Sequence, residues 1–193
     1  MTVLISAHQD KVKNHLDLSF RDGKHTGLLD NWLGILVTYM AFYDDPTFSI
    51  LEREDKIRIF HSTSEEFGSV GGLPKLKKND IALVVDVASG KQYEGIDFSL
   101  ENISGFTDEE IQNLKESLEW EGFNVLIKKY DANPIDEDEA WYWIKKKRKT
   151  MSFIIPIDQP TPEIGWHSNS CSVNSYRVGR AKQGLKRTIC YLL

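Results

Sequence analysis

The sequence contains few cysteines, no long apolar run and no excess of basic charge. Only Cys171 and Cys190 among the 193 residues are cysteines, which argues against a disulfide-rich scaffold and favours a reduced, cytoplasmic setting. No segment approaches the ~20 apolar residues that a membrane-spanning helix needs. Residues 1–7 also lack the basic start and the long apolar stretch of a secretory signal. We therefore expect a protein without a membrane partner.

The charge of the chain argues against nucleic acid as a partner. The net charge is -5 at pH 7, and one dense basic cluster occupies residues 145–149. That cluster follows an acidic run over residues 136–139, and this order of charges complements the dipole of a helix. A nucleic-acid patch is the alternative interpretation of the basic cluster, but the overall negative charge makes it the weaker one.

The pattern of apolar residues predicts alternating strands and helices in a single domain spanning residues 1–193. Apolar residues at helical spacing predict helices over residues 28–43, 107–120, 136–149 and 172–182. A capping-box pattern at Thr107 and Glu110 supports the second of these helices. Apolar and β-branched runs predict strands over residues 2–7, 56–61, 80–88, 93–103, 123–130, 152–157 and 186–193. This order predicts a three-layer α/β/α fold with a mixed, mostly parallel sheet.

Acidic and histidine side chains gather at the ends of the predicted strands and at the start of the first helix. They are His8, Asp10, Asp30, Glu65, Glu66 and Asp86. Sites of open α/β sheets form outside the carboxyl ends of the strands, so these segments can converge. A histidine combined with carboxylates suits zinc, which binds imidazole nitrogen and carboxylate oxygen. This combination of residue types therefore favours a zinc site.

Single residues of this set also have ordinary explanations. Asp10 lies two positions after His8, so on an extended segment it can orient the imidazole, although such a pair is usually a surface loop. Of Glu65 and Glu66, one can bind metal while the other acts as a base, although a glutamate pair is usually solvated. Asp86 stands in an apolar strand, where a carboxylate needs a partner, and a purely structural hydrogen bond would satisfy it.

Taken together and in order, four segments resemble the metal-site series of the co-catalytic zinc aminopeptidases, including deblocking, glutamyl and compact leucyl aminopeptidases. The segments read S-A-H-Q-D-K-V, G-L-L-D-N-W-L-G, T-S-E-E-F-G-S-V-G-G and V-V-D-V. The resemblance covers the first half of the chain well and the second half loosely. It implies a zinc-peptidase-like fold with two zinc ions, cobalt or manganese being the other metals that fit.

The resemblance also implies a role for each residue. Asp30 would bridge the two ions, His8 and Asp86 would complete one site, and Glu66 would belong to the other. Glu65 would be the general base on the bridging water.

A sixth residue, Asp10, would orient His8. The implied activity is an aminopeptidase acting on a peptide or a small amide. Two alternatives remain: a deacylase of small N-acyl amino acids, and a metal-poor relative that acts as a binding module.

The last metal ligand of this family is a histidine that follows a late strand near the end of the domain. Residues 170–180 and 185–193 resemble the helix and the strand before that histidine, so we expect the histidine to be absent. Families of this kind also carry a helix and strands before the strand that leads to His8, so we expect the domain to be shortened at both ends. His167 could replace it, an ordinary loop histidine being the alternative. Exposed sheet edges would then favour a homo-oligomer.

Overall fold

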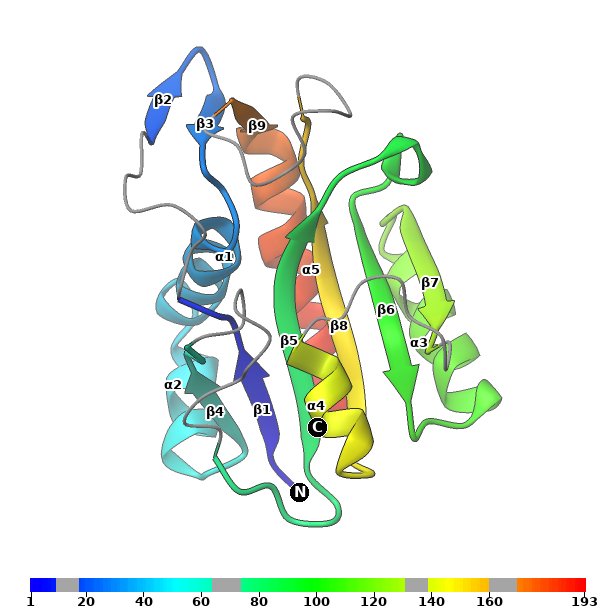
Figure 1. Cartoon of the computed structure of the whole chain (residues 1–193). Coiled ribbons are helices and arrows are strands. Elements are labelled where there is room, and N and C mark those ends of the chain that lie inside the picture. The colour runs from blue at the N-terminus through cyan, green and yellow to red at the C-terminus, as the bar shows by residue number, and fades with distance from the viewer. Residues whose placement is uncertain (10–17, 64–73, 131–138, 160–169) are drawn as a thin grey trace.

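The computed structural model describes residues 1–9, 18–63, 74–130, 139–159 and 170–193. A six-stranded sheet forms the centre, and its neighbouring strands are all parallel except β8 and β6. In spatial order the strands are β4 (Ile57–Phe60), β1 (Val3–Ser6), β5 (Ile81–Ala88), β8 (Lys149–Pro156), β6 (Phe98–Ser104) and β7 (Val125–Lys129) (Figure 1). The prediction of a mixed, mostly parallel sheet is confirmed.

Helices cover both faces of this sheet. In Figure 1, α4 lies in front of β5 and β8, whereas α5 lies behind them. The helices are α1 (Trp32–Tyr43), α2 (Pro46–Arg53), α3 (Asp108–Trp120), α4 (Glu139–Lys145) and α5 (Ser175–Leu192), with a short 3-10 turn, η2 (Lys91–Tyr93). The predicted three-layer α/β/α arrangement is therefore confirmed.

The central strand β5 shows why its sequence is almost continuously apolar. Leu83 and Val85 belong to the large core that β5 shares with α1 and α5. Ala82 and Val84 pack on the opposite face against Trp143 of α4. Because successive side chains of a strand point to opposite faces, a strand covered on both sides needs apolar residues at every position.

The carboxyl-terminal residues form a helix, so the prediction of a strand over residues 186–193 is wrong. Asn174 caps α5 by accepting a hydrogen bond from the backbone N–H of Arg177. From there Val178, Ala181, Leu185 and Ile189 are buried at intervals of three or four residues, the spacing of one helix face. The expected absence of the last histidine ligand depended on that strand, so it loses its basis.

Two further segments differ from the sequence-based expectation. Helix α2, which was not predicted, begins at Pro46, because Asp45 caps it and proline fits the first turn of a helix. A small antiparallel sheet, which was not predicted, contains β2 (Ser19–Arg21), β3 (Lys24–Gly27) and β9 (Cys171–Asn174). It lies beyond the carboxyl ends of β1, β5 and β8, at the top of Figure 1.

Helix α3 begins as predicted. The Thr107 hydroxyl accepts from the N–H of Glu110, and the Glu110 carboxylate accepts from the N–H of Thr107, which is the complete capping box. Ile111, Leu114 and Leu118 are buried, but Trp120 is 92% exposed. The buried face of α3 therefore ends at Leu118.

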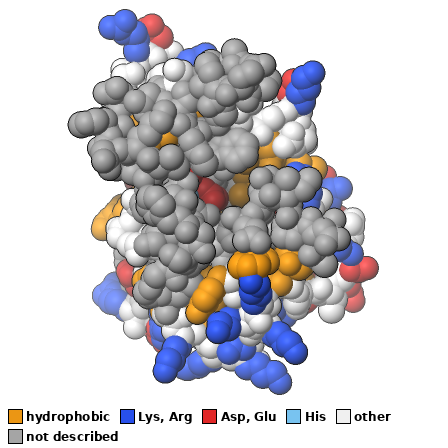
Figure 2. All heavy atoms as spheres, viewed as in Figure 1, with side chains coloured by type: hydrophobic (Ala, Val, Ile, Leu, Met, Phe, Trp, Pro, Cys, Tyr) orange, Lys and Arg blue, Asp and Glu red, His pale blue; other side chains and the backbone are white. Residues whose placement is uncertain are grey.

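Charge is unevenly distributed over the molecule. Lys75, Lys77 and Lys78 precede β5, and the basic residues 145–148 precede β8. Because β5 and β8 are parallel neighbours, both groups lie at the amino-terminal end of the sheet, the lower end in Figure 2, where Lys and Arg side chains gather. Within the described parts of the chain, no helix has the length and apolarity required to cross a membrane.

Candidate metal centre

His8 extends from the carboxyl end of β1. The parallel pairing of β1 with β4 continues past the last strand residues, since the Ala7 N–H donates to the Phe60 carbonyl at 3.2 Å. The Gln9 N–H likewise donates to the Ser62 carbonyl at 3.0 Å. The backbone on both sides of His8 is therefore fixed, and the imidazole itself is buried.

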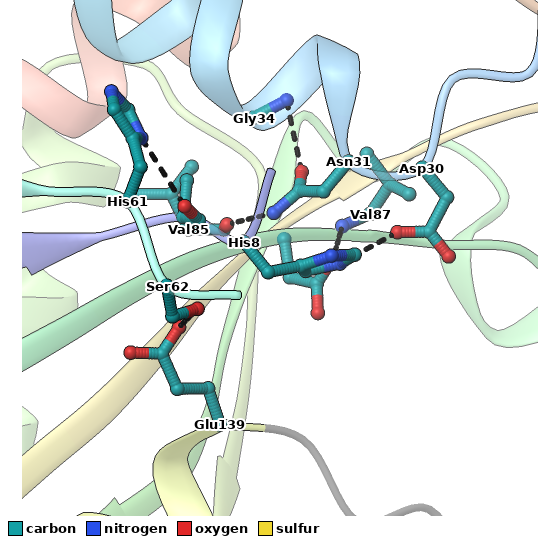
Figure 3. Close-up of polar contacts among 11 residues, drawn as sticks. His8, Asp30, Asn31, Gly34, His61, Ser62, Val85, Val87 and Glu139 are labelled. Atoms are coloured by element: carbon teal, nitrogen blue, oxygen red, sulfur yellow. Dashed lines mark hydrogen bonds and ion pairs between the residues drawn. The ribbon is translucent and has the colours of Figure 1, made fainter. Parts of the chain in front are cut away.

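Asp30 is placed by the residue that follows it. Asn31 is the N-cap of α1, and its side-chain oxygen accepts from the N–H of Gly34 at 3.0 Å. Its side-chain nitrogen donates to the Val85 carbonyl on β5 at 2.6 Å. The peptide bond between Asp30 and Asn31 is cis. Asn31 thus fastens the start of α1 to β5, and Asp30 faces His8 (Figure 3).

Asp86 lies near the carboxyl end of β5, the strand beside β1. Its position continues the alternate series of Ala82 and Val84, which face α4. One carboxylate oxygen accepts from the backbone N–H of Val87 at 2.8 Å. That short local bond sets the orientation of the carboxylate beside the histidine.

The three side chains form a compact cluster. Nε2 of His8 is 3.0 Å from Oδ1 of Asp30 and 3.5 Å from Oδ1 of Asp86. One donor atom from each residue lies within 4.8 Å of the other two. A tetrahedral zinc site with ligand distances of ~2.1 Å separates its ligand atoms by roughly 3.4 Å. The span and the nitrogen–oxygen composition of the cluster therefore fit one zinc-sized cation.

The electrostatics of the cluster favour a positive charge at its centre. Burial by itself would lower the pKa of His8, but the hydrogen bonds and charges of Asp30 and Asp86 outweigh it and raise the pKa to about 12. Two buried carboxylates are costly without a compensating cation. In the protein without metal, protonated His8 supplies that charge, and a divalent ion would supply it in the same place.

The other residues predicted for the site cannot be placed. Asp10, Glu65, Glu66 and His167 lie outside the described residues. Their roles remain predictions.

Sequence reasoning missed two features beside the cluster. Asn31 carried a detectable signal, since asparagine directly before an apolar helix pattern is a common N-cap. Glu139, whose carboxylate lies beside Ser62 in Figure 3, carried none, because an acid at the start of a helix is usually on the surface.

No known family model matches the chain, and no curated protein sequence matches it. Several solved structures match its fold. An M18-family aminopeptidase from Thermotoga maritima superposes with a TM-score of 0.61 at 10% identity, covering 86% of this chain and 46% of that one. An aminopeptidase from the archaeon Desulfurococcus kamchatkensis superposes with a TM-score of 0.59 at 15% identity, covering 90% and 51%.

A third structure, the PhTET1-12s dodecamer, has a TM-score of 0.57 at 13% identity and covers 88% of this chain and 52% of its own. At such low identities these likenesses establish the fold, which is that of these aminopeptidases. The chain spans about half the length of the aminopeptidases that it matches.

Proposed function

We propose that this chain is a zinc-dependent metallohydrolase, and specifically an aminopeptidase. The observation that carries the proposal is the convergence of His8, Asp30 and Asp86 at the carboxyl edge of a sheet with an aminopeptidase fold. Three residues separated by 22 and 56 positions in the sequence have no local reason to meet. A shared cation gives all three a common role.

The described cluster would hold one ion through Nε2 of His8 and one carboxylate oxygen each of Asp30 and Asp86. Asp30 has a second carboxylate oxygen, so it can bridge to a second ion together with Glu66. We propose His167 as a further ligand of that second ion, because it follows β8, whose carboxyl end lies beside that of β5. Metal ions bound there would polarise the substrate carbonyl and lower the pKa of water.

The chain's own residues would carry the protons. Glu65 would take a proton from the attacking water and deliver it to the nitrogen of the leaving amine, the task of a general acid–base. Asp10 would accept a hydrogen bond from the second nitrogen of His8, which keeps Nε2 directed at the ion. The substrate would be a peptide or small amide whose free amino terminus lies near the ions.

Zinc content after equilibration and dialysis tests the metal centre. We expect up to two zinc ions per chain in the natural protein, and a loss of zinc in His8→Ala and Asp86→Asn. His25→Ala, which removes a histidine of β3 outside the cluster, should keep the natural content. Zinc content equal in all four proteins would refute the proposed ligands, and absence of zinc from the natural protein would favour the metal-poor binding module.

Glu65→Gln tests the catalytic base. We expect this variant to retain zinc but to lose at least 100-fold in kcat for aminoacyl amides, since general acid–base catalysis contributes about 10²–10⁴-fold. Glu109→Gln, an exposed change on α3, is the control. Undiminished turnover in Glu65→Gln contradicts the role. Preference for acetyl-amino acids over aminoacyl amides would identify the deacylase.

Two broader parts of the proposal concern the cellular setting and assembly. The low cysteine content supports a cytoplasmic location. Among the described strands, β4 and β7 are the edges of the main sheet, which leaves backbone groups for pairing with another chain. With the dodecameric state of PhTET1-12s, these edges support a homo-oligomer.

A further inference from the structure

Glu139 is a buried carboxylate outside the metal-binding cluster. It is the first residue of α4, and only 1% of its surface is exposed. Glutamate is almost never fully buried unless it is paired, because removing an ionised carboxylate from water is costly. Burying the Glu139 carboxylate costs free energy, so its hydrogen bonds must compensate for that cost.

The contacts of Glu139 lead to the two strands that border the site. Oε2 accepts a hydrogen bond from the Ser62 hydroxyl at 2.8 Å, and Oε1 accepts a short one from the Ser6 hydroxyl. Both serines are completely buried. Ser6 is the last residue of β1, and Ser62 follows the end of β4 by two positions. Each carboxylate oxygen therefore binds one of two neighbouring strands.

These bonds reach the backbone that carries the candidate ligands. His8 lies two residues beyond Ser6, and the carbonyl of Ser62 accepts from the N–H of Gln9. Glu65 lies three residues beyond Ser62 in the sequence. In Figure 3 the carboxylate of Glu139 lies beside Ser62, on the opposite side of His8 from Asn31. One side chain thus ties together the two segments that lead into the site.

We propose that Glu139 is a positioning residue for the metal centre, which rests on the function proposed above. Through Ser6 and Ser62 it holds the carboxyl ends of β1 and β4 in one alignment, which keeps His8, two residues beyond Ser6, directed at the metal site. Apolar residues could fasten α4 to the sheet at equal or lower cost, since buried charges often add little net stability. Hydrogen bonds of defined direction fix the strand ends in a way that apolar contacts do not.

Glu139→Gln tests this role, because it keeps the shape of the side chain and removes one of the two acceptor oxygens. The matched control is Asp80→Asn. Asp80 is also a buried carboxylate, but it accepts from the backbone N–H groups of Thr2 and Lys77, at the opposite end of the sheet. Zinc affinity is measured by competition with a chelator, and backbone amide exchange of Ala7 and Gln9 is measured in the metal-free protein.

We expect Glu139→Gln to weaken zinc binding by about 10–100-fold, the usual effect of losing an outer support of a metal ligand. Exchange of the Gln9 amide should accelerate in the same variant. Asp80→Asn should change neither quantity, even if it lowers the melting temperature equally. Zinc affinity within twofold of the natural protein, or an equal loss in both variants, would overturn the proposal.

Two further outcomes are also decisive. If Glu139→Gln does not fold, Ser62→Ala removes only one hydroxyl and is judged by the same two measurements. If the natural protein binds no zinc, the proposed function fails, and amide exchange alone decides the role of Glu139. Faster exchange at Gln9 in Glu139→Gln but not in Asp80→Asn then supports the link to the strand ends, and equal exchange refutes it.

Discussion

At the residue scale, the proton on His8 connects the fold to metal binding. The pKa of His8 is raised from its ordinary value of 6.5 to about 12, with burial opposing and Asp30 and Asp86 favouring the charged form. A raised pKa in the folded state stabilises the metal-free protein fully below pH 6.5, and that stabilisation is lost as the pH rises toward 12. A metal ion at Nε2 must displace this proton.

We therefore predict that the first zinc ion bound near pH 7 releases about one proton from His8. The apparent zinc affinity should rise with pH in this range, because the proton competes for the same nitrogen. Titration calorimetry in buffers of different ionisation enthalpy measures the proton count. Zinc binding without proton release, or an affinity that falls as the pH rises, would show that Nε2 of His8 is not a ligand.

At the element scale, α5 depends on a close approach to the sheet. A Cβ placed on Gly184 would lie 2.1 Å from Cε1 of Phe98, whereas one placed on Gly179, in the same helix, would meet nothing within 4 Å. Phe98 cannot easily move, because it is fully buried and stacks on Phe153 with ring centroids 4.6 Å apart. Alanine substitutions at the two glycines therefore distinguish the cost of a clash with Phe98 from the gain in helix propensity.

We predict that Gly184→Ala lowers the free energy of unfolding by about 1–3 kcal/mol, the usual cost of overpacking a core. Gly179→Ala should raise it by about 0.5–1 kcal/mol, since alanine favours a helix interior more than glycine does. Urea unfolding of both variants measures the difference. Equal stability of the two would mean that α5 does not press on Phe98 in this way.

At the scale of the whole molecule, one ion would connect three separate parts of the chain. His8 follows β1, Asp30 precedes α1 and Asp86 belongs to β5, so an ion among them would cross-link the central sheet to a covering helix. The lysines of residues 75–78 and the basic residues 145–148 lie at the other end of the sheet, where they do not compete with a cation for the acidic cluster. Metal binding and global stability should therefore be linked.

We predict that zinc at about 100 times its Kd raises the free energy of unfolding by about 2.7 kcal/mol. For a chain of this length the corresponding rise in Tm is about 5–10 °C. Scanning calorimetry with and without a chelator measures it, and Asp86→Asn should lose most of the rise. An identical Tm with zinc and with chelator would count against an ion that joins these elements.

The sequence alone determined the features that depend on local pattern. β5 and the start of α3 were predictable, because a nearly continuous apolar run and a capping box are signals contained within a few residues. The approach of His8 to Asp86 was also predictable, because they lie at the carboxyl ends of the neighbouring parallel strands β1 and β5, which meet at one edge. None of these inferences needed the identity of a distant partner.

Tertiary structure alone decided the rest. The short strands β2, β3 and β9 contain three or four residues each, too few to show a period, and β3 pairs with β9 across up to 150 positions of sequence. Residues 186–192 read locally as a strand but continue α5, because their apolar side chains fit the core only on a helical face. Glu139 is buried because two serines more than 70 residues away bind both of its oxygens. The burial of a carboxylate depends on hydrogen-bond partners, and partners that are distant in the sequence cannot be identified from a local pattern.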